Sequence, residues 1–193
     1  MYRESSVLSL TNLSFYRIAT IVGALLLPAQ ALASSFTPES VGIRARFSGA
    51  TTLGKPQPEE FKAYDISADF RLPWRGDWET WYLGGSLMTS AGYLSASGQD
   101  SLVVSVTPKI RIASKHDGVY FDAGAGGAYL SRHQFERQDF GGAFQFSLTV
   151  GAGVTLYKGL GLGYRFMHYS DGGLHGSNNV GADFHMLEIN YRF

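Results

Sequence analysis

The sequence predicts an all-β fold, an eight-stranded antiparallel transmembrane β-barrel, on three observations. From residue 41 onward, apolar residues take every second position in segments of roughly ten residues, the pattern of barrel strands with one apolar face. The breaks between these segments are alternately short and long, as in outer-membrane barrels. The one long apolar run, 18–27, is shorter than the roughly 20 residues that a membrane-spanning helix needs. A membrane-inserted chain of this kind therefore crosses with strands.

The composition and the first residues limit how the chain can be organised into domains. Its 193 residues include 24 Gly, 13 Phe, 11 Tyr and no Cys, which indicates one β-rich domain without disulfides. Lys and Arg total 16 and Asp and Glu total 16, so no basic footprint for nucleic acid is present. Residues 1–33 resemble a cleaved signal peptide, with basic Arg3 and Arg17 near an apolar run and small residues ending at Ala33. The predicted barrel domain is 34–193.

The first four expected strands, 41–48, 64–72, 81–91 and 102–112, each alternate apolar with polar or charged side chains. The apolar face consists, in chain order, of Val41, Ile43, Ala45 and Phe47, then Tyr64, Ile66, Ala68, Phe70 and Leu72, then Trp81, Leu83, Leu87 and Ala91, and then Leu102, Val104, Val106, Ile110 and Ile112. Because successive strand residues point to opposite faces, one face of each strand suits lipid.

The last four expected strands, 119–129, 144–154, 160–166 and 187–193, follow the same rule. Their apolar residues are Val119, Phe121, Ala123, Ala125 and Tyr129, then Phe144, Phe146, Leu148, Val150 and Val154, then Leu160, Leu162, Tyr164 and Phe166, and then Leu187, Ile189, Tyr191 and Phe193. The count of eight strands follows from these repeats.

The connections give the barrel a direction. Breaks after the second, fourth and sixth strands are short, at 73–77, 114–118 and 157–159, whereas breaks after the odd-numbered strands are longer and polar. Short periplasmic turns and long extracellular loops are typical of bacterial outer-membrane barrels. The final Tyr191-Arg192-Phe193 resembles the C-terminal signature that the barrel-assembly machinery handles. We therefore expect an integral protein of the Gram-negative outer membrane.

The charged face of the strands points into the predicted barrel. Eight strands enclose a space just wide enough for side chains, so a porin channel is excluded. We expect a polar plug in which cationic side chains pair with acidic ones. The cationic members are Arg44, Arg46, Lys109, Arg111 and Arg165, and the acidic members are Asp65, Asp69, Asp122 and Glu188.

A possible catalytic set lies where lipid-facing residues are expected. Continuing the even-numbered face of segment 160–166 brings His168 and Ser170 onto the outside of the barrel at its extracellular end. The odd-numbered face of the last strand adds Asp183 if that strand extends so far. Ser, His and a carboxylate form the set that activates a hydroxyl nucleophile. Polar residues at the level of lipid headgroups also occur without any catalytic role.

The tract GYRFMHYSDGGLHGSNNVGADFHMLEINYRF, residues 163–193, resembles the C-terminal signature of the lipid A 3-O-deacylase (PagL) family. That signature is a strand ending in His-x-Ser-Asn, a Gly-containing loop with Asn, and an acidic residue opening the last strand. The tract DAGAGGAYLS, residues 122–131, and the Phe-rich sixth strand are also similar. Members are eight-stranded outer-membrane esterases whose site faces the outer leaflet.

The resemblance implies a serine esterase that removes the acyl chain at the 3 position of lipid A without a cofactor or metal. Ser170 would be the nucleophile, His168 the general base, and Asp183 the acid if the loop is one residue longer than in the family. Asp171 replaces the family's Asn, and an ionised carboxylate cannot donate to an oxyanion. Backbone N–H groups near Gly172 and Gly173, with Asn178, would then stabilise that charge.

Further expectations concern partners. Lipid A and other outer-membrane lipids are the expected partners, and a homodimer is an alternative to a monomer. Basic Arg132, His133 and Arg137 in one long loop either contact lipid A phosphates or are simply solvated. The competing hypothesis is a non-enzymatic small barrel, of the adhesin or stress-porin type, whose site has degenerated through Asp171 and the altered acidic position.

Overall fold

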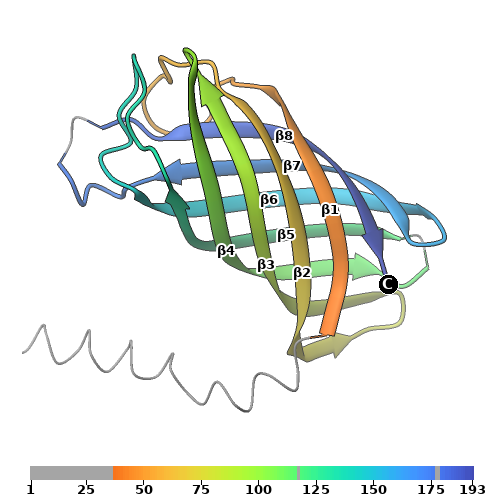
Figure 1. Ribbon diagram of the computed structural model, residues 1–193. Coiled ribbons are helices and arrows are strands. Elements are labelled where there is room, and N and C mark those ends of the chain that lie inside the picture. Colours follow the sequence, from red (N-terminus) through yellow and green to blue (C-terminus); the bar gives the residue numbers. More distant parts are fainter. Residues whose placement is uncertain (1–36, 117, 177–178) are drawn as a thin grey trace, which may run out of the picture. The chain divides into compact units, whose positions relative to one another are not determined.

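The computed structural model describes residues 37–116, 118–176 and 179–193, which form one closed antiparallel barrel with the strands in sequence order (Figure 1). This confirms the predicted fold class. The eight strands are β1 Thr37–Ser48, β2 Lys62–Asp77, β3 Trp81–Ala96, β4 Gln99–Ser114, β5 Val119–Leu130, β6 Phe144–Tyr157, β7 Leu160–Ser170 and β8 Ala182–Arg192. The predicted signal peptide, 1–33, lies outside the described residues and stays a prediction.

The barrel closes where the first strand meets the last. β1 pairs antiparallel with β8, with Val41 opposite Tyr191 and Ile43 opposite Ile189. Closure pairs every strand on both sides, so no open edge of the sheet is left for another chain to join. It also satisfies the backbone hydrogen bonds that lipid could not.

The outer wall of the barrel is apolar. Alternation places large hydrophobic side chains on the outside of the barrel, where they are exposed. Such a surface is unfavourable in water and suits lipid. They include Val41, Ile43, Ile66, Leu102, Val106, Ile110, Phe121, Leu148, Val150, Leu162, Leu187 and Ile189. These are the residues that the sequence assigns to the lipid face. No helix among the described residues is long and apolar enough to cross a membrane.

The first part of the barrel interior is the ionic network that the sequence predicts. Arg44 pairs with Asp65 at 2.6 Å and Lys109 with Asp69 at 2.8 Å. Buried Arg165 contacts two carboxylates, at 2.7 and 3.0 Å. Charges removed from water need such partners.

Arg46 is the exception within the predicted plug. Its guanidinium donates to the carbonyl oxygen of Phe61 and lies over the ring of Phe184, 5.4 Å from the centroid. The predicted pairing of Arg46 with the interior carboxylates stays a prediction. Arg46 stands close to the end of β1, beyond the layer of carboxylates, where aromatic side chains fill the barrel instead.

The second part of the interior is an aromatic and aliphatic cluster below the long loops. Phe61 lies 4.9 Å from Phe135 and 5.6 Å from Phe140 between ring centroids, and Phe184 joins them at 6.1 Å from Phe61. Three of these residues, Phe61, Phe135 and Phe140, belong to loops and fold back into the barrel mouth. The sequence did not predict this cluster, because loop residues carry no strand periodicity.

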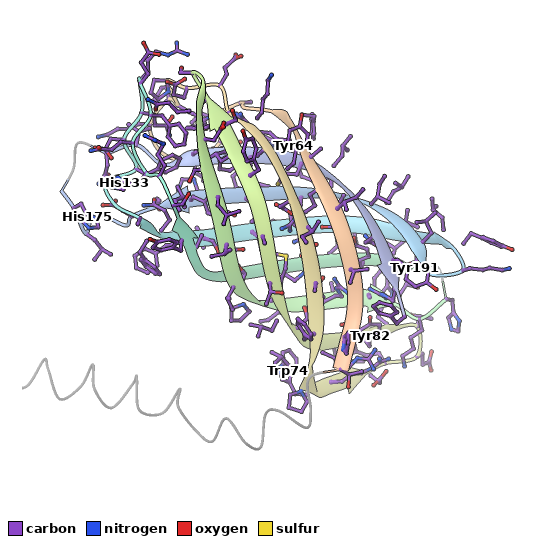
Figure 2. The ribbon with its side chains drawn as sticks, viewed as in Figure 1. Tyr64, Trp74, Tyr82, His133, His175 and Tyr191 are labelled. Carbon is purple, nitrogen blue, oxygen red and sulfur yellow. The ribbon has the colours of Figure 1, made fainter. Side chains whose placement is uncertain are left out.

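The two ends of the barrel differ as expected, with two corrections to the connections. β2 continues through Pro73 to Asp77, with a register shift between Arg71 and Arg75, so the predicted break at 73–77 is wrong. A proline fits there because the irregular pairing removes the need for its missing N–H. Figure 2 places His133 and His175 at the loop end and Trp74, Tyr82 and Tyr191 at the other.

The second correction concerns the predicted long break after the third strand. Only Ser97 and Gly98 separate β3 from β4, and both have left-handed φ values, 51° and 70°. Two such residues make the tight turn that suits a twisted hairpin. The apolar alternation of the outward face stops because the outward positions beside this turn are Ser95 and Asp100, whose backbones pair regardless of their side chains. Three long loops remain at this end: 49–61, 131–143 and 171–181.

Candidate active site on the outer wall

His168 and Asp183 face each other across two neighbouring strands. They are direct Cα partners in the β7–β8 ladder, which brings opposite side chains of one face within contact distance. Nδ1 of His168 lies 2.6 Å from Oδ1 of Asp183. β8 begins at Ala182, so the strand extends far enough to include Asp183. A carboxylate at this distance keeps the proton on Nδ1 and leaves Nε2 as the basic nitrogen.

Asp183 is almost completely covered, and the loop after β1 covers it. Its side chain is 1% exposed, and its Oδ2 accepts from the backbone N–H groups of Thr52 at 2.5 Å and Leu53 at 2.7 Å. The side-chain oxygen of Gln57 accepts the N–H of Asp183 itself, at 2.9 Å. Both carboxylate oxygens are therefore hydrogen-bonded, which fixes the orientation of the group toward His168.

Ser170 ends β7 on the same outward face as His168, opposite Phe146 of β6. A β-carbon built on Gly181 would lie 3.1 Å from Cε1 of His168 and 3.2 Å from Cβ of Ser170. Both side chains thus border one small space that a glycine leaves open. Within the described residues, the Ser170 hydroxyl and the imidazole form no hydrogen bond. In free enzymes such bonds often tighten only with substrate.

Asp171 is a buried anchor of the β7–β8 loop, a role that the sequence did not reveal. It is 3% exposed and accepts from the N–H of Gly173 at 2.8 Å, the N–H of His175 at 2.9 Å and the amide of Asn179 at 2.5 Å. Burial would raise the pKa of Asp171, but these donors outweigh it and hold the pKa below its ordinary value. The carboxylate is directed into the loop.

The predicted oxyanion donors differ in whether their N–H groups are already hydrogen-bonded. The N–H of Gly173 is already bonded to Asp171, and Asn178 lies outside the described residues. Gly172, with a left-handed φ of 64°, packs over the ring of Phe146, and its N–H has no acceptor among the described residues. Of the two glycine N–H groups, that of Gly172 is therefore the one that the described contacts leave available.

The loop after β5 contacts the residues that directly precede β8 and holds them in place. The buried amide of Gln138 donates to the carbonyl oxygens of Val180 at 3.2 Å and Gly181 at 2.9 Å, directly before β8. In the same loop, Arg137 pairs with buried Glu59 at 3.1 Å. Burial would raise the pKa of Glu59, but hydrogen bonds from Arg137 outweigh it and lower the pKa. Of the basic residues predicted to meet phosphate, Arg137 therefore has a protein partner.

Two further observations concern the other basic residues of the loop after β5 and the groups that could bind a metal. His133 lies 3.4 Å from the carboxylate of Asp139, which also caps the N–H of Gly141. Arg132 is exposed on the same loop. Among the described residues, no group of three or more His, Asp or Glu side chains is arranged to hold a metal ion.

The chain is similar to known proteins in sequence and in fold. A family model described as lipid A 3-O-deacylase (PagL) matches residues 62–192. Lipid A deacylase PagL of Bordetella bronchiseptica (strain ATCC BAA-588 / NCTC 13252 / RB50) is 34% identical over 74 residues, which span 38% of this chain and 41% of that relative. The chain thus spans less than half the length of this curated relative.

Among solved structures, the crystal structure of the outer membrane enzyme PagL is similar, with a TM-score of 0.64 and 20% identity over 80% of this chain and 99% of that chain. This likeness shows the shared barrel fold. The Yersinia pestis outer membrane protein Ail, in a phospholipid bilayer nanodisc, covers the same shares with a TM-score of 0.46 and 10% identity. That similarity is too low to bear on the site.

Proposed function

The chain belongs to the lipid A 3-O-deacylase (PagL) family, and from this premise we propose that it hydrolyses the ester-linked acyl chain at the 3 position of lipid A. The observation that carries the proposal is the hydrogen-bonded pair of His168 and Asp183 beside Ser170, on the outer wall at the loop end. An ester buried in the outer leaflet can reach such a site without entering the barrel.

In the proposed reaction Ser170 is the nucleophile. Its Oγ attacks the ester carbonyl carbon while Nε2 of His168 takes the hydroxyl proton. The tetrahedral intermediate collapses, the bond to the sugar oxygen breaks, and His168 returns the proton to that oxygen. An acyl-enzyme and the freed 3-hydroxyl result. Water, activated by His168, then hydrolyses the acyl-enzyme and releases the fatty acid.

Asp183 orients His168 and stabilises the imidazolium that forms twice in this cycle. The backbone N–H groups of Thr52 and Leu53, in the β1–β2 loop, donate to the carboxylate of Asp183 and fix it, which supports that role. We assign the oxyanion contact to the N–H of Gly172, two residues after the nucleophile. Asn178 stays a prediction. No metal or cofactor enters the proposed chemistry.

The membrane setting supports the same assignment. The exposed apolar wall and the family place the protein as an integral component of the outer membrane. The long loops would face the outside, as is typical of bacterial outer-membrane barrels. We further propose removal of residues 1–33 and insertion by the barrel-assembly machinery, for which exposed Phe193 and Tyr191 at the C-terminus are the supporting feature.

Mass spectrometry of lipid A tests the activity. The protein is expressed in a Gram-negative host whose lipid A carries an acyl chain at the 3 position, with Ser170→Ala as the matched control. We expect the wild type to remove one acyl chain and the variant to remove none. Intact lipid A in the presence of folded wild type, or equal loss with Ser170→Ala, contradicts the proposal and favours the non-enzymatic barrel.

A further inference from the structure

A second histidine occupies the outer wall beside the site. His185 lies two residues after Asp183 in β8 and points outward from the same strand. Its Nδ1 is 2.7 Å from the hydroxyl of Tyr164, and its Nε2 is 3.0 Å from the carbonyl oxygen of Ala50 and 3.3 Å from the hydroxyl of Thr52. A polar ring on a lipid-facing wall is costly unless it is fully bonded, and this ring is bonded at both nitrogens.

The partners of His185 determine its tautomer. A carbonyl oxygen can only accept, so the contact with Ala50 requires a proton on Nε2. In the neutral ring, Nδ1 is then an acceptor, and the hydroxyl of Tyr164 donates a hydrogen bond to it. The direction of donation runs from Tyr164 of β7, through His185 of β8, to the loop that follows β1.

Aromatic rings surround this chain of hydrogen bonds. The ring of His185 lies 5.3 Å from that of Phe166 and 6.4 Å from that of Phe47, between centroids. These apolar neighbours pack against the ring, while its hydrogen bonds lie at the exposed surface of the wall. The contact to Ala50 joins the loop after β1 to β8.

The loop that His185 binds is the loop that binds Asp183. Ala50 and Thr52 contact the imidazole of His185, while the N–H groups of Thr52 and Leu53 donate to Oδ2 of Asp183. One strand residue between Asp183 and His185 keeps both side chains on one face, about 6–7 Å apart along β8. The short segment 50–53 bridges them.

We propose that His185 is a positioning residue for the deacylation reaction. It fixes segment 50–53, this segment holds the carboxylate of Asp183, and Asp183 orients His168. His185 contacts neither Ser170 nor His168 among the described residues, so its effect is transmitted through Asp183. This inference rests on the proposed function for its kinetic part only.

Kinetics on lipid A in mixed micelles test the proposal through His185→Phe, which keeps an aromatic ring and removes the hydrogen bonds of both ring nitrogens. We expect kcat to fall about tenfold, the factor that one ordinary hydrogen bond represents, with KM within about twofold. His185→Gln, whose amide can still donate to Ala50, should recover most of kcat. Leu187→Ala, the next outward position of β8, is the control and should leave kcat unchanged.

A double-mutant cycle separates positioning from a general structural effect. In an Asp183→Asn background, His185→Phe should lower kcat by no more than about twofold, because its route through Asp183 is already broken. If the full tenfold loss is repeated in that background, His185 acts independently of Asp183 and the proposal is overturned.

A measurement without substrate keeps this inference distinct from the proposed function. In detergent-solubilised protein labelled with ¹⁵N-histidine, the ring ¹⁵N chemical shifts of His168 should move in His185→Phe and stay in place in Leu187→Ala. Unmoved His168 signals in His185→Phe overturn the proposal. Wild type that leaves lipid A intact would instead remove the proposed function, while the chemical shifts still decide whether His185 positions the His168–Asp183 pair.

Discussion

Gly181→Ala tests whether His168 and Ser170 must share the small space that Gly181 leaves open. The added methyl group would lie 2.5 Å from the carbonyl oxygen of Tyr169, 3.1 Å from Cε1 of His168 and 3.2 Å from Cβ of Ser170. The first contact is with backbone, which cannot yield as a flexible side chain does. To remove this clash, the backbone at the junction of β7 and β8 must shift. Misplacement of about 1 Å in an active site costs about 100-fold in rate.

We expect Gly181→Ala to lower kcat about 100-fold, or roughly 2.7 kcal/mol in the activation barrier. Release of acyl chain from lipid A in mixed micelles measures kcat, and the heat-dependent gel mobility of the barrel reports folding. Gly76→Ala is the matched control, since a β-carbon there meets nothing within 4 Å. A folded Gly181→Ala protein with wild-type kcat would show that His168 and Ser170 do not work across this space.

Three further predictions address the acid, the loop and the interior. Asp183→Asn should lower kcat by about 10³–10⁴, the loss known for triads whose base is left in the wrong tautomer, with the barrel still folded. Ionised Asp171 stabilises the loop 171–181, and because its folded pKa is lowered, this stabilisation should be complete above about pH 4 and lost as the pH falls further, which hydrogen exchange of the loop amides can follow. Arg165→Leu leaves buried Asp122 without its closest cation, so the barrel should lose about 3–5 kcal/mol in urea unfolding from micelles, and an unchanged midpoint would contradict the ionic-network account.

Strand parity made much of the barrel predictable from the sequence. A period of two assigns each residue to the lumen or the lipid, and a shift of one residue would reverse every assignment. The same rule placed His168 and Asp183 on one face before any pairing was known. The register of β7 and β8 then added that the two residues lie directly opposite each other.

The supports of the site could not be predicted in the same way. Thr52 and Leu53 hold Asp183 through backbone N–H groups, which every residue except proline carries, so their side chains give no signal. Asp171 stands in a motif position where an oxyanion donor was expected, and its direction into the loop depends on donors several residues further on. Ser97 and Gly98 show the converse, a two-residue turn hidden within a polar stretch that resembled a long loop.

The placement of His168 and Asp183 on the outer wall, and not in the barrel lumen, changes what substrate concentration means for this protein. Under the proposed function, lipid A would reach Ser170 by lateral diffusion within a leaflet, so the encounter rate would depend on the number of lipid molecules per unit of membrane area. The aqueous concentration of lipid does not enter. Diluting lipid A with another lipid in the same leaflet should slow the reaction, whereas diluting the membranes in buffer should not.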